Sequence, residues 1–178
     1  MKVMVKYGFI LGVICLLASS VLAVVNGVTE PKIALQKEKE EQAALKELMP
    51  DAVSFEPYIA EGKTEFYRAF DAEHKIKGFV LKCQGKGYSS EIEVLAGLDR
   101  ALAIGEVKIL SANETPGLGS KITEPSFRNQ FKGKNLKTFD EIQAITGATI
   151  SSRAVMQAIK NKMSSLQDTL TSEINNAQ

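Results

Sequence analysis

The stretch Thr146-Gly147-Ala148-Thr149-Ile150-Ser151-Ser152 marks the place where an expected strand ends and a long helix begins. Apolar side chains recur at helical spacing over residues 151–171. They fall on one face of the expected helix: Val155, Ile159, Met163 and Leu166. The residues just before the stretch, 138–145, are consistent with a last strand. The C-terminal part of the chain is therefore expected to combine a sheet with one amphipathic helix.

Residues 63–110 have the pattern of an antiparallel meander. Apolar and aromatic runs alternate there with turn residues, which gives four expected strands: 66–70, 76–83, 90–98 and 101–110. The prolines and glycines in residues 113–121 predict a loop, and residues 124–131 predict a short helix. We therefore expect an α+β protein whose globular part, residues 51–178, has an antiparallel sheet and flanking helices.

The N-terminal region predicts a membrane anchor. Residues 7–25 are apolar and uncharged, which is about the length of a helix that spans a bilayer. Lys2 and Lys6 precede this run, and Glu30 is the first acid after it. The positive-inside rule then places the N-terminus in the cytoplasm and the rest of the chain outside it. A cleaved signal peptide is the alternative, but the apolar run is longer than a usual signal core.

The segment after the anchor is expected to be a helical stalk. Pro31 suits a first helical turn, good helix formers follow it, and Pro50 ends the helix. The expected organisation is an anchor at residues 1–26, a stalk at 27–50 and an extracytoplasmic domain at 51–178.

Composition excludes several classes of function. The formal charge of +1 and the lack of tryptophan argue against a nucleic-acid-binding surface. Cys15 and Cys83 are too few for an iron–sulfur or zinc cluster or for a disulfide framework. His74 is the one histidine, which leaves little for a Ser-His-Asp triad or a multi-histidine metal site.

The run 146–152 has two readings. A helix N-terminus presents free N–H groups and the positive end of the helix dipole, and small and hydroxyl-bearing residues allow a phosphate group to approach. The same residues are also what ordinary helix capping requires. Composition alone favours the cap.

The run Thr146-Gly147-Ala148-Thr149 resembles the flavinylation motif of the FMN-binding domains in the RnfG and NqrC subunits of ion-translocating electron-transfer complexes. Two other segments support the resemblance: Glu114-Thr115-Pro116-Gly117-Leu118-Gly119-Ser120-Lys121 is similar to a loop close to the flavin in RnfG-type domains, and residues 85–92 are similar to a third family segment. One difference is Gln143, which stands where the family usually has an aspartate.

The resemblance implies that FMN is attached by a phosphoester to Thr149, by a separate flavin transferase that uses FAD. Thr146, Ser151 and Ser152 would contact the phosphate, with Gly147 and Ala148 allowing close approach. Thr115, Gly117 and Leu118 would line the ring or the ribityl chain.

Three further residues are expected near the flavin. Glu114 would accept a flavin or ribityl hydrogen bond, with pairing to Lys121 as the alternative. Lys121 would favour reduced, anionic flavin. Tyr88 would pack near the ring, with a purely structural role as the alternative.

The implied function is electron transfer. The resemblance places the chain in a membrane complex that moves electrons between ferredoxin and NAD and couples this to sodium or proton translocation, with other integral membrane and redox subunits and the lipid bilayer as partners. An anchored module without redox function, or a flavinylated domain of another extracytosolic reductase, is the alternative.

Overall fold

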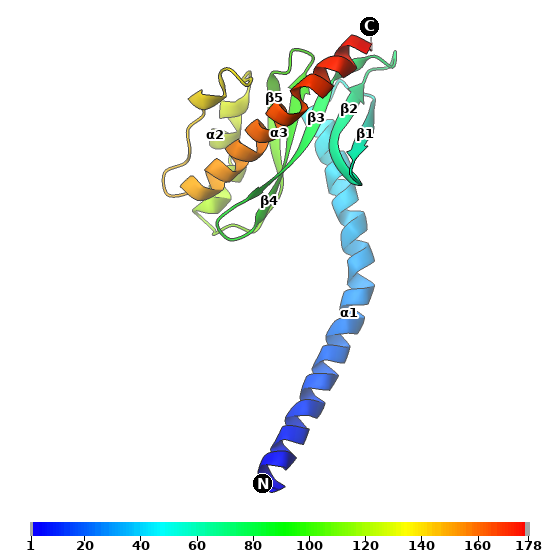
Figure 1. Ribbon diagram of the computed structural model, residues 1–178, viewed down its shortest axis with the longest axis vertical. Coiled ribbons are helices and arrows are strands. Elements are labelled where there is room, and N and C mark those ends of the chain that lie inside the picture. Colours follow the sequence, from blue (N-terminus) through cyan, green and yellow to red (C-terminus); the bar gives the residue numbers. More distant parts are fainter. Residues whose placement is uncertain (1, 177–178) are drawn as a thin grey trace. The chain divides into compact units, whose positions relative to one another are not determined.

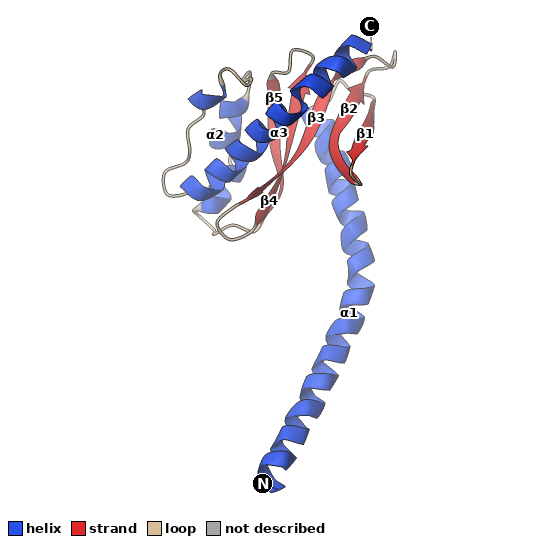
Figure 2. Cartoon of the chain, viewed as in Figure 1, coloured by secondary structure: helices blue, strands red, loops and turns tan. Residues whose placement is uncertain are grey.

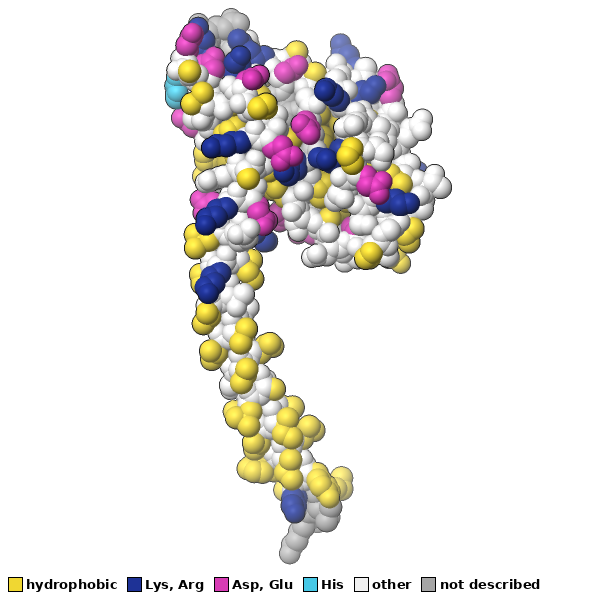
Figure 3. All heavy atoms as spheres, turned by 180° about the vertical axis from the view of Figure 1, so that it is seen from behind, with side chains coloured by type: hydrophobic (Ala, Val, Ile, Leu, Met, Phe, Trp, Pro, Cys, Tyr) yellow, Lys and Arg dark blue, Asp and Glu magenta, His cyan; other side chains and the backbone are white. Residues whose placement is uncertain are grey.

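The computed structural model describes residues 2–176. Helix α1 (Lys2–Leu48) continues without interruption through Pro31, so the anchor and the stalk helix form one element. Its large apolar side chains from Met4 to Leu35 are exposed, and Figure 3 shows them around the helix. Within the described residues, this is the one helix long and apolar enough to cross a membrane, which indicates a membrane anchor.

The chain divides into two compact units between Glu41 and Gln42. The second unit therefore includes the last turns of α1, which the sequence alone assigns to the stalk. Ala44, Leu45 and Leu48 are buried there against Val80 and Leu95 of the sheet. Residue 1 of the expected anchor and residues 177–178 of the expected domain lie outside the described residues.

The second unit contains one five-stranded antiparallel sheet in the order β1-β2-β3-β4-β5 (Figures 1 and 2). The strands are β1 (Ser54–Ala60), β2 (Lys63–Phe70), β3 (Ile76–Lys86), β4 (Glu91–Asp99) and β5 (Ile104–Ala112). The expected meander is confirmed, and β1 is an addition to it. Strand β1 carries Pro57, which an edge strand tolerates because one of its sides has no ladder.

In two turns of the meander, β2–β3 and β4–β5, an aspartate side chain accepts hydrogen bonds from backbone amides of the turn. Asp71 Oδ1 accepts hydrogen bonds from the amides two and four residues further on, each at 2.9 Å, and Asp99 Oδ1 does the same at 2.9 Å. Each turn then has one residue with a positive φ, His74 at 60° and Leu102 at 58°. The turn residues thus set where β3 and β5 begin.

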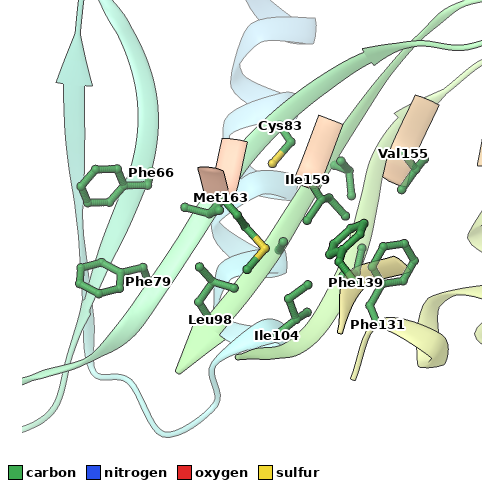
Figure 4. Packing of buried hydrophobic residues seen from close by; sticks show 14 of the residues in the cluster. Phe66, Phe79, Cys83, Leu98, Ile104, Phe131, Phe139, Val155, Ile159 and Met163 are labelled. Atoms are coloured by element: carbon green, nitrogen blue, oxygen red, sulfur yellow. The ribbon is translucent and has the colours of Figure 1, made fainter. Parts of the chain in front are cut away.

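Helix α3 (Thr149–Asn176) covers one face of the sheet, and the last turns of α1 cover the other. Figure 4 shows the core between the sheet and α3, where Phe79, Leu98, Ile159 and Met163 meet. The expected apolar face of this helix is confirmed, since all four of its predicted residues are buried. Cys83 is buried in the same core, and this burial raises the pKa of its thiol to about 12.

Residues 113–148 connect β5 to α3 and contain short helical segments. These are the short α-helix α2 (Pro125–Arg128) and the 3-10 helices η1 (Gly119–Thr123), η2 (Asn129–Phe131) and η3 (Phe139–Glu141). The expected short helix is confirmed as α2 with η2. The expected strand at 138–145 is wrong. Gln130 takes the place of a partner strand, because its side chain accepts from the Gln143 amide at 2.9 Å and donates to the Gln143 carbonyl at 3.4 Å.

Candidate functional site

A groove of about 590 Å³ lies at the N-terminus of α3. Three segments that are distant in sequence form its walls, and they contribute Tyr88, Glu114, Thr115, Leu118, Gly119, Gly147, Ala148, Thr149, Ile150 and Ser151. Its volume falls within the range of small-molecule sites, which is roughly 300–1,000 Å³. The structure therefore brings together residues from all three segments that the sequence analysis singled out.

The backbone at the start of α3 has unpaired donors. The first helical hydrogen bond runs from the Ser152 amide to the Ala148 carbonyl at 2.9 Å. The amides of Thr149, Ile150 and Ser151 precede it, and none of them has an acceptor among the described residues. Such amides, with the positive end of the helix dipole, are the donor set that binds phosphate.

The helix is not capped by a hydroxyl side chain. Ala148 is the residue before the helix, and alanine has no side-chain oxygen to accept from the first-turn amides. Gly147 precedes it with a φ of 82°, in the left-handed region that glycine adopts without strain. The reading of this run as an ordinary Thr or Ser cap is therefore not what the structure shows, and the amides remain open towards the groove.

The hydroxyl groups of the run differ in availability. Thr149 is exposed and lines the groove. The Ser152 hydroxyl is fully buried, donates to the Ala148 carbonyl at 2.8 Å and accepts from the Ile145 amide at 3.1 Å. Both the amide and the hydroxyl of Ser152 thus have partners within the protein, and its expected contact with the phosphate stays a prediction.

Glu114 is the centre of a hydrogen-bond network beside the groove. Its side chain is 7% exposed, and Ser151 Oγ donates to its Oε2 at 2.6 Å. The Tyr88 amide donates to the same oxygen at 3.2 Å, and the amides of Ser89 and Ser90 donate to Oε1 at 3.1 Å each. The carboxylate thereby joins the β3–β4 turn, the segment after β5 and the first turn of α3.

Two glycines make room for this carboxylate. A Cβ atom added to Gly87 would lie 2.3 Å from Glu114 Oε1. One added to Gly119 would lie 2.7 Å from Oε2 and 2.8 Å from Ser151 Oγ. Any larger residue at either position would have to displace the network, so both glycines are required by close approach.

Burial by itself raises the pKa of Glu114, but the hydrogen bonds from Ser151 and from the amides of Ser90, Ser89 and Tyr88 outweigh it and hold that pKa below the ordinary value of 4.5. The carboxylate is therefore ionised at neutral pH. Its charge is balanced by N–H and O–H donors.

Acidification is expected to destabilise this unit through Glu114. Because the folded-state pKa lies below the unfolded one, the stabilisation is complete above about pH 4.5 and is lost as the pH falls through the folded value. Urea unfolding of the full chain in detergent, followed by circular dichroism between about pH 6 and about pH 3, measures the effect. Glu114→Gln is the control; an equally steep pH dependence in that variant would contradict the assignment.

The loop after Glu114 is held by its own hydrogen bonds. The Leu118 and Ser120 amides both donate to the Thr115 carbonyl at 3.2 Å, and the Gly117 amide donates to Ser120 Oγ at 2.9 Å. Gly117 has a φ of 74°, which the turn requires. This folded loop presents Leu118 to the groove.

Three large apolar side chains stand exposed at the groove: Tyr88 at 71%, Leu118 at 49% and Ile150 at 55%. They come from its three separate walls. A planar aromatic ligand would cover them, which gives the groove an apolar part next to the polar helix terminus.

Some expected residues lie outside the lining. Thr146, Gly117, Lys121 and Ser152 do not line the groove. The alternative pairing of Glu114 with Lys121 is not formed among the described residues, since Glu114 is held by the donors named above. Sequence reasoning missed two lining residues, Gly119 and Ile150. The sequence does contain an indication for Ile150: it is apolar and lies in the first turn of α3, but not on the face of the helix that packs on the sheet.

A second recess, of about 650 Å³, lies between the start of β2, the end of β3 and the middle of α3. Its polar walls include an ion pair between Lys162 and Glu65. It has no helix terminus and no exposed large apolar side chain. Within the described residues, no group of three or more His, Cys, Asp or Glu side chains is placed to hold a metal ion.

Comparison with known proteins agrees with this geometry. A family model described as an FMN-binding domain matches residues 87–164, which include all ten groove residues. A second model, described as the RnfG N-terminal region, matches residues 1–48, which correspond to α1.

Two curated proteins are similar over most of their length. The chain is 32% identical over 159 residues to the G subunit of the proton-translocating ferredoxin:NAD(+) oxidoreductase complex of Clostridium ljungdahlii, covering 84% of each chain. It is 31% identical over 185 residues to the G subunit of the Na(+)-translocating ferredoxin:NAD(+) oxidoreductase complex of Acetobacterium woodii, covering 89% of each.

A solved structure shares the fold. The crystal structure of Shewanella oneidensis NqrC aligns with a TM-score of 0.52 and 22% identity, over 70% of this chain and 74% of that one. At this identity the likeness shows the fold alone.

Proposed function

This chain belongs to the RnfG family, the G subunits of ion-translocating oxidoreductase complexes, and we propose that it is the subunit that carries covalent FMN on Thr149. The observation that carries the proposal is the groove at the N-terminus of α3, where an exposed threonine hydroxyl stands beside unpaired helix amides. The groove lies within the residues that match an FMN-binding domain.

The residues present fit this cofactor. The amides of Thr149, Ile150 and Ser151 would donate to the phosphate oxygens, and Gly147 leaves the backbone open to close approach. Leu118, Ile150 and Tyr88 would pack against the isoalloxazine. Bound FMN supplies reversible electron acceptance and donation, which no side chain in the groove provides.

Attachment at Thr149 is a phosphoryl-group transfer. With FAD as the donor, a bond forms between Thr149 Oγ and the phosphorus of the FMN half, the bond to the bridging oxygen of the pyrophosphate breaks, and AMP leaves. The threonine hydroxyl gives up its proton. We assign this reaction to a separate flavin transferase, and this chain supplies the exposed hydroxyl in a fixed position.

The groove is suited to electron transfer and not to acid–base chemistry on a substrate. Its one carboxyl group, on Glu114, is 7% exposed and has both oxygens occupied by donors. A general acid or base needs a free lone pair or proton within reach of the substrate. The role of this chain is therefore to hold the cofactor where partner subunits can exchange electrons with it.

The proposed cellular arrangement follows from the charges that flank the anchor. Lys2 and Lys6 favour a cytoplasmic N-terminus and an FMN domain on the extracytoplasmic side of the membrane. Ferredoxin and NAD are the proposed terminal redox partners of the whole complex, and sodium or protons are the translocated ions. Protease added to spheroplasts is expected to digest the FMN domain without membrane lysis; protection until lysis would contradict this orientation.

The direct test is covalent attachment. The full chain, produced together with a flavin transferase, is expected to give a flavin-fluorescent band after denaturing electrophoresis. Peptide mass spectrometry is expected to find the peptide that contains Thr149 heavier by one FMN less one water. A pure chain without bound flavin after co-production would overturn the proposal.

A further inference from the structure

We propose that Glu114 is a positioning residue that arranges the N-terminus of α3 for flavin attachment before any cofactor is present. The inference rests on the function proposed above and assigns to Glu114 a role different from contact with the flavin. Its carboxylate acts through Ser151 on one side and through the β3–β4 turn on the other.

Because both oxygens of the Glu114 carboxylate already have donors, Glu114 is not placed to accept a hydrogen bond from the flavin or its ribityl chain. Oε2 accepts from Ser151 Oγ and from the Tyr88 amide, and Oε1 accepts from the amides of Ser89 and Ser90. Ser90 Oγ is an additional donor to Oε1, at 3.5 Å. A side chain that is 7% exposed and has donors on both oxygens is not available to a ribityl hydroxyl or a ring nitrogen.

The bond to Ser151 sets the rotation of the first helical turn. Ser151 follows Thr149 by two positions, which is about 200° around an α-helix. When Glu114 holds Ser151 inward at 2% exposure, Thr149 must therefore point away from that contact, and it is exposed in the groove. The position of the attachment hydroxyl is thus determined by a bond that Thr149 itself does not make.

The same bond leaves one hydroxyl available for attachment in the groove wall formed by α3. The Ser151 hydroxyl donates to Glu114, and the Ser152 hydroxyl donates to the Ala148 carbonyl. Thr149 is the remaining hydroxyl of that first turn and is exposed. Glu114 therefore favours attachment at Thr149 over attachment two residues further on.

The network also connects the groove walls. The amides that Glu114 accepts from belong to residues 88–90, which carry Tyr88 into the groove, and Glu114 itself leads into the loop that carries Leu118. Because Gly87 and Gly119 pack directly on the carboxylate, the three walls meet at one buried charge. Loss of that charge is expected to loosen all three walls together.

The test compares Glu114→Gln and Ser151→Ala with the control Glu124→Gln. The Glu124 carboxylate lies in the same segment, is exposed and accepts one hydrogen bond, from the exposed Ser126 hydroxyl at 3.4 Å. In the full chain without flavin, amide hydrogen exchange is expected to speed up in Glu114→Gln at residues 88–90 and at Ser152, whose amide makes the first helical hydrogen bond of α3. The maximal rate of flavin attachment by the purified transferase is expected to fall roughly ten- to a hundredfold, with an unchanged KM for FAD.

The double variant Glu114→Gln/Ser151→Ala decides whether the two residues act as one unit. If Glu114 acts through Ser151, the double variant attaches flavin no more slowly than Glu114→Gln alone. If the two substitutions lower the attachment rate additively, Glu114 does not act through Ser151. If Glu114→Gln has wild-type amide hydrogen exchange and a wild-type attachment rate, Glu114 is not a positioning residue. If Glu114→Gln does not fold, Ser151→Ala alone must show the slower attachment, and a wild-type rate in it overturns the proposal.

The two proposals fail separately. A wild-type chain that never acquires flavin refutes covalent attachment at Thr149. Hydrogen exchange in the flavin-free chain still tests whether Glu114 orders the groove, because that readout needs no cofactor.

Discussion

Thr149→Ala is expected to abolish covalent flavin completely. The change removes the one exposed hydroxyl in the first turn of α3, while Ser151 and Ser152 remain bound to Glu114 and Ala148. The measurement is in-gel flavin fluorescence with peptide mass spectrometry, after co-production with the transferase. Unfolding free energy is expected to change by no more than about 0.5 kcal/mol, because the Thr149 side chain is exposed.

Two matched variants make this result specific. Thr146→Ala removes another exposed hydroxyl of the same run, three residues upstream and outside the groove lining, and is expected to retain flavin. Thr149→Ser keeps the hydroxyl and is expected to retain attachment at a lower rate. Flavin found on another residue of Thr149→Ala would contradict both the assignment and the proposed selectivity.

Phe131→Ala is expected to destabilise the second unit by about 3–5 kcal/mol. Phe131 is fully buried, and its ring packs edge-on against Phe127 at 5.3 Å and Phe139 at 5.9 Å between centroids. The segment between β5 and α3 forms no strand; two backbone hydrogen bonds of 2.7 Å join Gly133 and Lys134 to Ile104, and the three rings pack the segment into the core. Alanine would leave a cavity that the rigid neighbours fill only partly.

Urea unfolding of the full chain in detergent measures this effect through the midpoint of the transition. Lys132→Ala is the control, because that neighbouring side chain is exposed and the change is expected to stay within about 0.5 kcal/mol. Because residues 113–148 lead into Thr149, flavin attachment is also expected to fall in Phe131→Ala. An unchanged midpoint would show that the three rings are not part of the cooperative core.

Failures of sequence reasoning in this chain have a common cause. Residues 138–145 have strand-like composition, yet Gln130 satisfies the Gln143 backbone from the side and leaves no ladder to join. Strand β1 carries Pro57 and alternates poorly, yet it pairs with β2 over its whole length. In both cases a partner elsewhere in the chain decided the backbone conformation, and local pattern carries no information about that partner.

Glu114 illustrates the same limit at the site. The loop that contains it resembles a family segment, and the resemblance predicts that Glu114 lies near the flavin. Its contacts to Ser89 and Ser151 span 25 and 37 positions in sequence, so its role as the link between three segments depends on how the chain folds. No periodicity or motif length specifies such a contact.

What the sequence determined by itself is local or periodic: the apolar anchor, the meander, the amphipathic α3 and the threonine at its start. These follow from side-chain spacing and helix propensity, which act within a few residues. Only the tertiary structure placed the last turns of α1 on the sheet, made Ala148 the residue before α3 and gave both oxygens of the Glu114 carboxylate hydrogen-bond donors. Those features depend on burial and on hydrogen bonds between distant segments, because a buried polar group takes whichever partner the fold brings within reach.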